Sequence, residues 1–339
     1  MGRCGDLPAE GGAPAIVAPA RGKAFPQQAH RDRNRLVPTI TDQIIAMLDR
    51  VTTEFRLPWY SPARNMMRPV NIASNKAYRG VNILALWATA HEKGYSSGTW
   101  GTYRQWAEAG AQVRKGEKSA YIVFYKELTV AREDGDSDET DTRHFARAMP
   151  VFAAEQVDGW TAPKVDAPLP TIMTPIEQAE AFVAATGASV THGGDRAFYR
   201  PSTDTIQLPP REAFIGSPTS TPAEAYYSTA LHELTHWTSH ESRCNRQLGK
   251  RFGDDAYAME ELVAELGAAF LCADLGITAE PRPDHAQYLN HWLTVMKADK
   301  RAIFTAASKA SDATAFLAAL QTAKPYLFAN LQREISPQF

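Results

Sequence analysis

Residues 225–237 read AYYSTALHELTHW, and they predict a buried helix built around two histidines. His232 and His236 are one helical turn apart, so both imidazoles lie on one face and reach a single metal ion. Glu233 then lies beside the metal, where a carboxylate can take a proton from a bound water. The alternative is a surface helix with two unrelated histidines. Burial is favoured because the apolar positions continue one helical face: Tyr227, Leu231 and Leu234.

A catalytic zinc needs a third protein ligand and one open position. Residues 259–271, MEELVAELGAAFL, offer three glutamates on a helix that is otherwise apolar. We expect Glu261 to be the ligand, with Glu265 as the alternative ligand. In the preferred arrangement Glu265 accepts the N–H of one of the two histidines and sets its tautomer. Glu260 is expected to be exposed.

Two further parts of a hydrolytic site are predicted less directly. A donor for the developing oxyanion is needed opposite the base, and His285 and Tyr288 on one helical face are the candidates; a surface or capping role is the alternative for His285. Residues 204–208, DTIQL, predict an edge strand, either pairing with an extended peptide or without a ligand. We expect Zn²⁺ as the cofactor, with Mn²⁺ possible because two imidazoles and a carboxylate accept either ion.

Length and composition indicate a two-domain soluble protein. The chain has 339 residues, 44% of them hydrophobic and 22% charged. Its longest largely apolar stretch, 81–90, is well short of the roughly 20 residues that cross a membrane, so no membrane partner is expected. Residues 1–20 lack the apolar segment of a secretory signal, and the three cysteines form no CxxC pair. We therefore expect a cytoplasmic location.

The overall charge of −2 conceals a basic, aromatic segment. Residues 55–126 hold 11 Lys/Arg against 3 Asp/Glu, a net of +8, together with 12 aromatic residues. Cations that track phosphates and aromatic faces that stack on bases are the means by which proteins hold single-stranded nucleic acid. This segment therefore predicts a nucleic-acid-binding region, although solvated lysines and core tryptophans are the simpler reading of each element alone.

Two basic turns carry the candidate nucleic-acid contacts. Residues 75–82, NKAYRGVN, lead into a helix N-terminus, and residues 114–118, RKGEK, lead into a strand. Tyr103 and Trp106 are further stacking candidates. The residues expected to contact single-stranded DNA are Tyr78, Arg79, Asn82, Trp100, Arg104, Arg114, Lys115 and Lys118.

The chain divides at the proline-rich stretch 161–175. We predict a flexible arm over 1–38, a small α+β nucleic-acid-binding domain over 39–162 with an acidic loop at 131–144, and a mostly helical domain with a short sheet over 163–339. The fold class is therefore α+β. Capping boxes begin helices after Thr102, Thr174 and Thr221. The predicted helices are 40–51, 81–92, 103–109, 175–187, 222–240, 256–275, 284–298 and 300–323, and the predicted strands are 119–130, 145–153, 188–200 and 204–208.

Several of these motifs resemble one family. YRGVNILALW at 78–87 and QWAEAGAQVRKGEKS at 105–119 resemble the N-terminal single-stranded-DNA-binding domain of ArdC-type antirestriction proteins from conjugative plasmids, which plasmid TraC primases share. The later motifs are similar to the zincin-like metallopeptidase domain of the same proteins; they are HELTHWTSHESRCNR at 232–246, FGDDAYAMEELVAELGAAFL at 252–271 and HAQYLNHWLTVMKADKRAIFTAASKA at 285–310.

The resemblance implies roles for individual residues. His232 and His236 match the family's metal-binding histidines, Glu233 its general base and Glu261 the glutamate of its EELVAE segment. Cys244 departs from the aliphatic residue expected there and would add a thiol near the site. The family further implies a product of a mobile element that binds entering single strands and blunts host restriction, with a peptide or protein substrate. The rival interpretation is a non-enzymatic DNA-binding antirestriction protein whose metal site is structural or vestigial.

Overall fold

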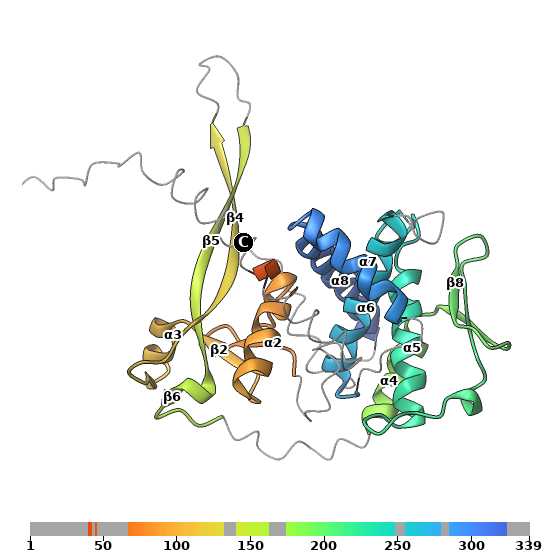
Figure 1. Ribbon diagram of the computed structural model, residues 1–339, viewed down its shortest axis with the longest axis horizontal. Coiled ribbons are helices and arrows are strands. Elements are labelled where there is room, and N and C mark those ends of the chain that lie inside the picture. The colour runs from red at the N-terminus through yellow and green to blue at the C-terminus, as the bar shows by residue number, and fades with distance from the viewer. Residues whose placement is uncertain are drawn as a thin grey trace, which may run out of the picture.

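A computed structural model provides the three-dimensional structure of the chain (Figure 1). It describes residues 40–42, 45, 67–131, 140–162, 174–247, 255–278 and 285–323, with the backbone alone at 125–131, 140–146, 255, 285–291 and 322–323. The predicted arm 1–38 lies outside the described residues, as do most of the helix expected at 40–51 and the core of the proline-rich boundary. None of the helices described is both long and apolar enough to span a membrane.

The N-terminal part is a small sheet with two helices. Four strands form a sheet in the order β1-β2-β5-β4, in which β1 runs parallel to β2 and the other neighbours are antiparallel. A separate two-stranded sheet joins β3 to β6. The elements are β1 (Val70–Asn71), α2 (Val81–Lys93), β2 (Thr99–Gly101), α3 (Tyr103–Glu108), β3 (Gln112–Val113), β4 (Ala120–Ala131), β5 (Thr140–Ala153), a 3₁₀ turn (Ala154–Gln156) and β6 (Val157–Asp158).

Strands β4 and β5 form a long antiparallel hairpin that projects beyond the sheet (Figure 1). Its register runs from the pair Ala120–Val151 to the pair Ala131–Thr140. The acidic loop predicted over 131–144 is therefore too long, because residues 140–144 belong to β5 and pair with β4. Residues 132–139 lie outside the described part of the chain. Backbone pairing across the hairpin and the β-branched Thr residues at 140 and 142 outweigh the polar composition of this stretch.

The C-terminal part is mostly helical, with a three-stranded sheet at one side (Figure 1). Its sheet has the order β7-β9-β8, with β7 parallel and β8 antiparallel to β9. The elements are α4 (Pro175–Ala185), β7 (Ser189–His192), β8 (Phe198–Arg200), β9 (Thr205–Leu208), a 3₁₀ turn (Arg211–Ala213), α5 (Pro222–Trp237), α6 (Asp255–Leu275), α7 (His285–Ala298), α8 (Ala302–Ala319) and a closing 3₁₀ turn (Leu320–Ala323).

The central position of β9 corrects one expectation. Residues 204–208 were expected to form an edge strand that could pair with a peptide, but β9 is hydrogen-bonded on both sides, to β7 and to β8. Ile206 and Leu208 are fully buried, and a strand whose side chains fill the core is stabilised by neighbours on each side. The backbone of this strand is therefore not available to a substrate.

Capping boxes begin three of the helices, α3, α4 and α5, as predicted. In α3 the Gln105 amide donates to Thr102 Oγ1 at 3.2 Å, and the Thr102 amide donates to Gln105 Oε1 at 2.9 Å. The same reciprocal boxes begin α4 at Thr174 and α5 at Thr221. Each box satisfies two amides that have no partner within the helix, and each of these boxes was predicted.

The two parts of the chain share a hydrophobic core. Apolar residues of α2 belong to the same buried cluster as those of α5, α6 and α8. Trp87 packs edge-on against Phe270, with 5.7 Å between ring centroids. Arg68 lies over the same Phe270 ring and forms an ion pair of 3.0 Å with Asp274. Helix α6 therefore contacts the N-terminal part at one end and, as described next, carries the glutamates of the metal site near the other.

Candidate metal centre

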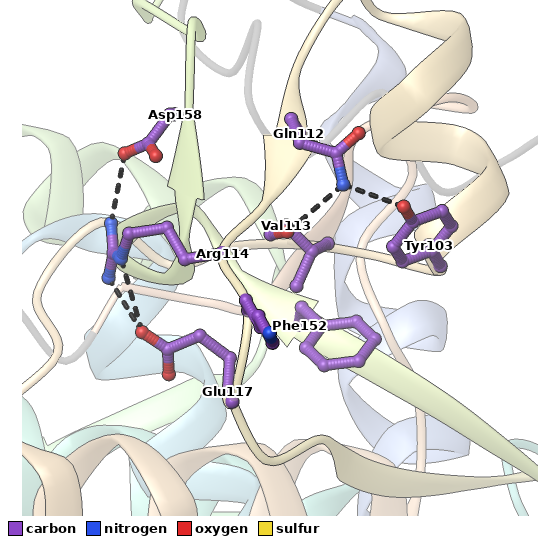
Figure 2. A pocket seen from close by; sticks show the side chains of 9 residues that line it. Tyr103, Gln112, Val113, Arg114, Glu117, Phe152 and Asp158 are labelled. Atoms are coloured by element: carbon purple, nitrogen blue, oxygen red, sulfur yellow. Dashed lines mark hydrogen bonds and ion pairs between the residues drawn. The ribbon is translucent and has the colours of Figure 1, made fainter.

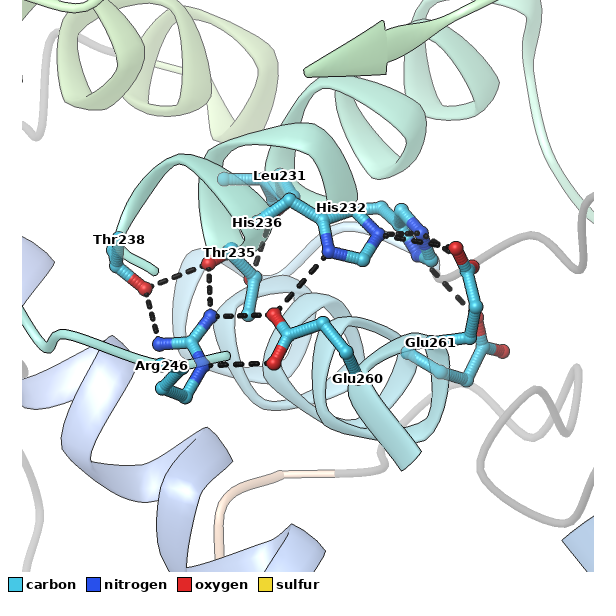
Figure 3. Close-up of polar contacts among 9 residues, drawn as sticks. Leu231, His232, Thr235, His236, Thr238, Arg246, Glu260 and Glu261 are labelled. Carbon is cyan, nitrogen blue, oxygen red and sulfur yellow. Dashed lines mark hydrogen bonds and ion pairs between the residues drawn. The ribbon is translucent and has the colours of Figure 1, made fainter. Parts of the chain in front are cut away.

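Helix α5 places the two histidines of the HELTH motif together. His232 and His236 are buried, and their Nε2 atoms are 3.1 Å apart (Figure 3). The close crossing of α5 with α6 depends on Gly267, because a Cβ at this position would lie 2.5 Å from the Thr235 side chain. The absence of a side chain at 267 therefore lets the glutamates of α6 approach the histidines.

Glu261 supplies the third donor. Its Oε2 atom is 3.5 Å from His232 Nε2, and its Oε1 atom is 3.6 Å from His236 Nε2. A tetrahedral ion with ligands at ordinary zinc distances separates neighbouring donor atoms by about 3.3 Å. The three donor atoms lie within 4.8 Å of one another, so their spacing fits the ligand set of a divalent metal.

The other nitrogen of each imidazole faces a carboxylate. Glu265 Oε2 lies 3.6 Å from His232 Nδ1, and Glu260 Oε1 lies 3.3 Å from His236 Nδ1. In the neutral rings, Glu260 favours a proton on Nδ1 of His236, whereas Glu265 at 3.6 Å lies beyond hydrogen-bond distance of His232; the Nε2 lone pairs are then directed at each other and at Glu261. Such a convergence of lone pairs calls for a cation, and this donor chemistry fits a metal ion.

Glu260 is the main departure from the prediction for this site. It was expected to be exposed, but only 5% of its surface is accessible. Its carboxylate receives hydrogen bonds from Arg246 Nε at 3.0 Å and Nη2 at 2.8 Å (Figure 3). A buried carboxylate needs such a partner. Neither residue was singled out as part of the site; the available signal was a third glutamate on an apolar helix and an arginine in the loop after α5.

The site has an excess of negative charge. Burial lowers the pKa of His236, but the carboxylates of Glu261 and Glu260 outweigh it and raise that pKa to about 10. Burial raises the pKa of Glu261, yet the neighbouring His236 and His232 hold it well below its usual range. Glu233, the residue after His232, is also buried and adds to the field at His236. An environment of this sign attracts cations.

Two residues of α7 and Cys244 complete the residues singled out from the sequence of this domain. His285 begins α7 and Tyr288 lies in its first turn, in the stretch for which the structure describes the backbone alone. The amide of Cys244 donates to the Thr238 carbonyl at 2.9 Å, and burial raises the pKa of its thiol. A raised pKa disfavours the thiolate, which is the nucleophilic form of a cysteine side chain.

Three of the candidate DNA contacts have structural roles. Trp100 was expected to stack on bases, but it is 2% exposed and packs in a core cluster with Leu86, which corrects that assignment. The Asn82 side chain bonds both the amide and the carbonyl of Val123, at 2.8 and 2.9 Å, and so ties α2 to β4. The Tyr78 hydroxyl accepts from Asn71, and burial raises its pKa.

The remaining candidates are exposed cations. Arg79 forms an ion pair with Asp312 at 3.4 Å, and Arg104 pairs with Glu108 at 2.7 Å. Lys118 is exposed. Arg79 therefore contacts α8, whereas residues 114–117 line a cavity together with Tyr103 of α3.

Arg114 and Lys115 line a cavity of about 580 Å³ beside α3 (Figure 2). Arg114 is bonded there to Glu117 and Asp158, at 2.8 and 3.5 Å. Tyr103 is 53% exposed in the same cavity, and its hydroxyl accepts from Gln112 at 2.6 Å. The structure thus brings one stacking candidate and two of the predicted cations together.

The fold and the site define the chain as a protein with a zincin-like metallopeptidase domain behind a small α+β domain. Residues 177–309 match the family model of the zincin-like metallopeptidases, and residues 34–157 match that of the N-terminal domain of the anti-restriction factor ArdC. The chain belongs to the ArdC-type antirestriction proteins.

Similar proteins cover most of the chain. It is 46% identical to the uncharacterized protein y4eC of Sinorhizobium fredii (strain NBRC 101917 / NGR234), over 86% of this chain and 95% of that protein. It is 36% identical to a DNA primase TraC of Escherichia coli, over 83% of this chain but only 27% of the primase. The crystal structure of metal-free ArdC from the R388 plasmid superposes with a TM-score of 0.68, at 39% identity over 85% of this chain and 98% of that one. The Mn(II)-bound form gives a TM-score of 0.65.

Proposed function

We propose that this protein hydrolyses peptide bonds at a divalent metal held by His232, His236 and Glu261, and that its N-terminal domain binds single-stranded DNA. The observation that carries the first half is the convergence of two Nε2 atoms and one carboxylate within 4.8 Å, with both Nδ1 atoms facing other carboxylates. Zinc is the proposed ion; the Mn(II)-bound form of the R388 ArdC supports manganese as an alternative.

When bound, the metal would polarise the substrate carbonyl and lower the pKa of water at the site. Glu233 accepts the proton of the attacking water and later gives it to the leaving amine, which one carboxylate can do in both directions. Glu260 holds the His236 ring in the orientation that directs Nε2 inward, and Glu265 is the proposed outer partner of His232. His285 and Tyr288 remain the proposed donors to the oxyanion.

The experiment for this half compares wild type with Glu233→Gln. Metal content is measured by mass spectrometry, and cleavage of a broad peptide library is measured with and without single-stranded DNA. We expect both proteins to bind metal stoichiometrically and only wild type to cleave. Equal cleavage by the variant would refute the role of Glu233, and metal binding without cleavage by either protein would favour the non-enzymatic alternative.

The DNA-binding half rests on the surface around the cavity of Figure 2. An exposed aromatic ring, Tyr103, and the cation Lys115 line the same cavity, and Lys118 is close in sequence. Single strands are held by this combination of stacking and phosphate contacts. The match to the ArdC N-terminal domain and to TraC primases supports the proposal. The proposed setting is the cytoplasm of a host that receives a mobile element, with residues 161–175 as the boundary between the two domains.

A further inference from the structure

Arg246 connects the loop after α5 to the metal site through a single carboxylate. Its guanidinium binds both oxygens of Glu260, and Glu260 Oε1 faces Nδ1 of His236 (Figure 3). We propose that Arg246 and Glu260 are a positioning pair for His236, which sets the affinity of the site for a divalent metal. This inference rests on the proposed metal site.

The geometry of the pair favours positioning over simple charge balance. Two parallel hydrogen bonds, from Nε at 3.0 Å and Nη2 at 2.8 Å, fix the plane of the Glu260 carboxylate. A lysine supplies the same charge from one point and cannot reproduce this fork. The orientation of Glu260 therefore depends on an arginine at position 246.

The arginine is itself held by the end of α5. Nη1 donates to Thr238 Oγ1 at 2.7 Å, and Nη2 donates to the Thr235 carbonyl at 2.6 Å. Thr235 precedes His236, so the residue that orients Glu260 is anchored to the same helix turn as the ligand. A network of hydrogen bonds therefore runs from the α5 backbone through Arg246 and Glu260 to the His236 ring, and it is called the Glu260 network below.

Because the Glu260 network is buried, its loss should change the affinity of the site for a metal ion. The side chains of Arg246 and Glu260 are 4% and 5% exposed, so water does not replace a lost hydrogen bond. The His236 ring then loses the acceptor that holds Nε2 toward the metal position. Outer partners of metal-binding histidines commonly change metal affinity by about 10–100-fold.

The same loop offers a matched control. Arg243 also binds a carboxylate through both terminal nitrogens, but its partner is Asp204, next to strand β9. Arg243 stacks over Trp237 with 3.8 Å between the guanidinium carbon and the ring centroid. Arg243→Lys therefore removes an equivalent two-point contact between an arginine and a carboxylate in the same loop, and it leaves the Glu260 network unchanged.

The test measures Zn²⁺ and Mn²⁺ affinity of the full chain by competition with a chelator, and the melting temperature of the metal-free protein. We expect Arg246→Lys and Glu260→Gln to weaken metal binding by about 10–100-fold. Arg243→Lys should lower the melting temperature as well, but it should change the metal affinity by less than about 2-fold. The EPR spectrum of Mn²⁺ at saturation should change in Glu260→Gln and not in Arg243→Lys.

Equal affinities for Arg246→Lys and Arg243→Lys would overturn the inference, as would affinity losses in proportion to the loss of melting temperature. If wild type and all the variants bind metal with the same affinity, the positioning role of Arg246 and Glu260 is refuted and the proposed function still stands. Wild type that binds neither ion would refute both.

Discussion

Gly267 of α6 lies directly against Thr235 of α5, and a Cβ at position 267 would come within 2.5 Å of the Thr235 Cγ2 atom. Thr235 is fully buried, and its hydroxyl donates to the Leu231 carbonyl at 2.8 Å, so it has no room to move. The two helices that carry all three proposed metal ligands therefore meet at a position where a larger side chain does not fit.

Gly267→Ala is expected to destabilise the protein, although alanine is the better helix former by up to about 1 kcal/mol. Overpacking a close contact costs about 1–3 kcal/mol and would move α6 away from the histidines. Urea unfolding and metal affinity should both show a loss. In the double variant Gly267→Ala with Thr235→Ala the clash is relieved, so recovery of metal affinity is the control, and a more stable single variant would contradict the packing argument.

The ion pair between Arg68 and Asp274 should be important for holding the two domains together. Its side chains are 6% and 11% exposed, and removing one partner of a buried pair costs about 3–5 kcal/mol. Arg68→Met should therefore lower the free energy of unfolding by an amount in this range, measured by chemical denaturation. The matched control is Arg79→Met, whose pair with Asp312 is more than half exposed and worth at most about 1 kcal/mol. Equal losses of unfolding free energy in the two variants would contradict a stabilising role for the buried pair.

Single-stranded DNA binding should depend on Lys115 and Lys118 through phosphate contacts. Each contact contributes about 0.7 to the slope of log affinity against log salt for a single strand. The double alanine variant should therefore lower that slope by about 1.4 in a fluorescence titration at several salt concentrations. The control is Lys93→Ala, an exposed lysine at the end of α2, which removes the same single charge as either Lys115→Ala or Lys118→Ala alone and should leave the slope unchanged.

Tyr103 should contribute to the same binding by a different mechanism. Its ring is exposed at the rim of the cavity, and loss of one base-stacking side chain costs about 1–3 kcal/mol of binding free energy. Tyr103→Ala should weaken binding with the salt slope unchanged, and Tyr103→Phe should retain most of the affinity. A changed slope with the ring removed would mean that the residue acts through the cations around it.

The Asp204–Arg243 pair predicts a dependence of stability on pH. The hydrogen bond from Arg243 is the main cause that holds the pKa of Asp204 below its ordinary value, so folding favours the ionised carboxylate. The stabilisation is fully present above the unfolded-state pKa of about 3.9 and is lost as the pH falls through the lower folded-state pKa. The stability difference between wild type and Asp204→Asn should accordingly be constant near pH 6 and shrink below about pH 4; a difference that persists at low pH would contradict this assignment.

Local patterns determined the features that depend on residues within one helical turn. The beginning of α5 follows from Thr221 and Glu224, and the pairing of His232 with His236 follows from their spacing. Such features need no knowledge of the fold, because a capping box and an i, i+4 pair are complete within a single helix. Glu261 was also the expected ligand, because Glu261 and Glu265 are one turn apart on an otherwise apolar helix, and this assignment stays a proposal until metal binding is measured.

Tertiary structure alone decided that Glu260 faces the site and that Trp100 lies in the core. Glu260 and Glu261 are adjacent on α6, and the contact of Gly267 with Thr235 sets the rotation that turns both toward the histidines. The partner of Glu260 comes from a separate loop, at Arg246. Trp100 is similarly part of the core because β5 pairs with β2. These outcomes depend on where a second element passes, and the periodicity of one segment carries no information about the position of its neighbour.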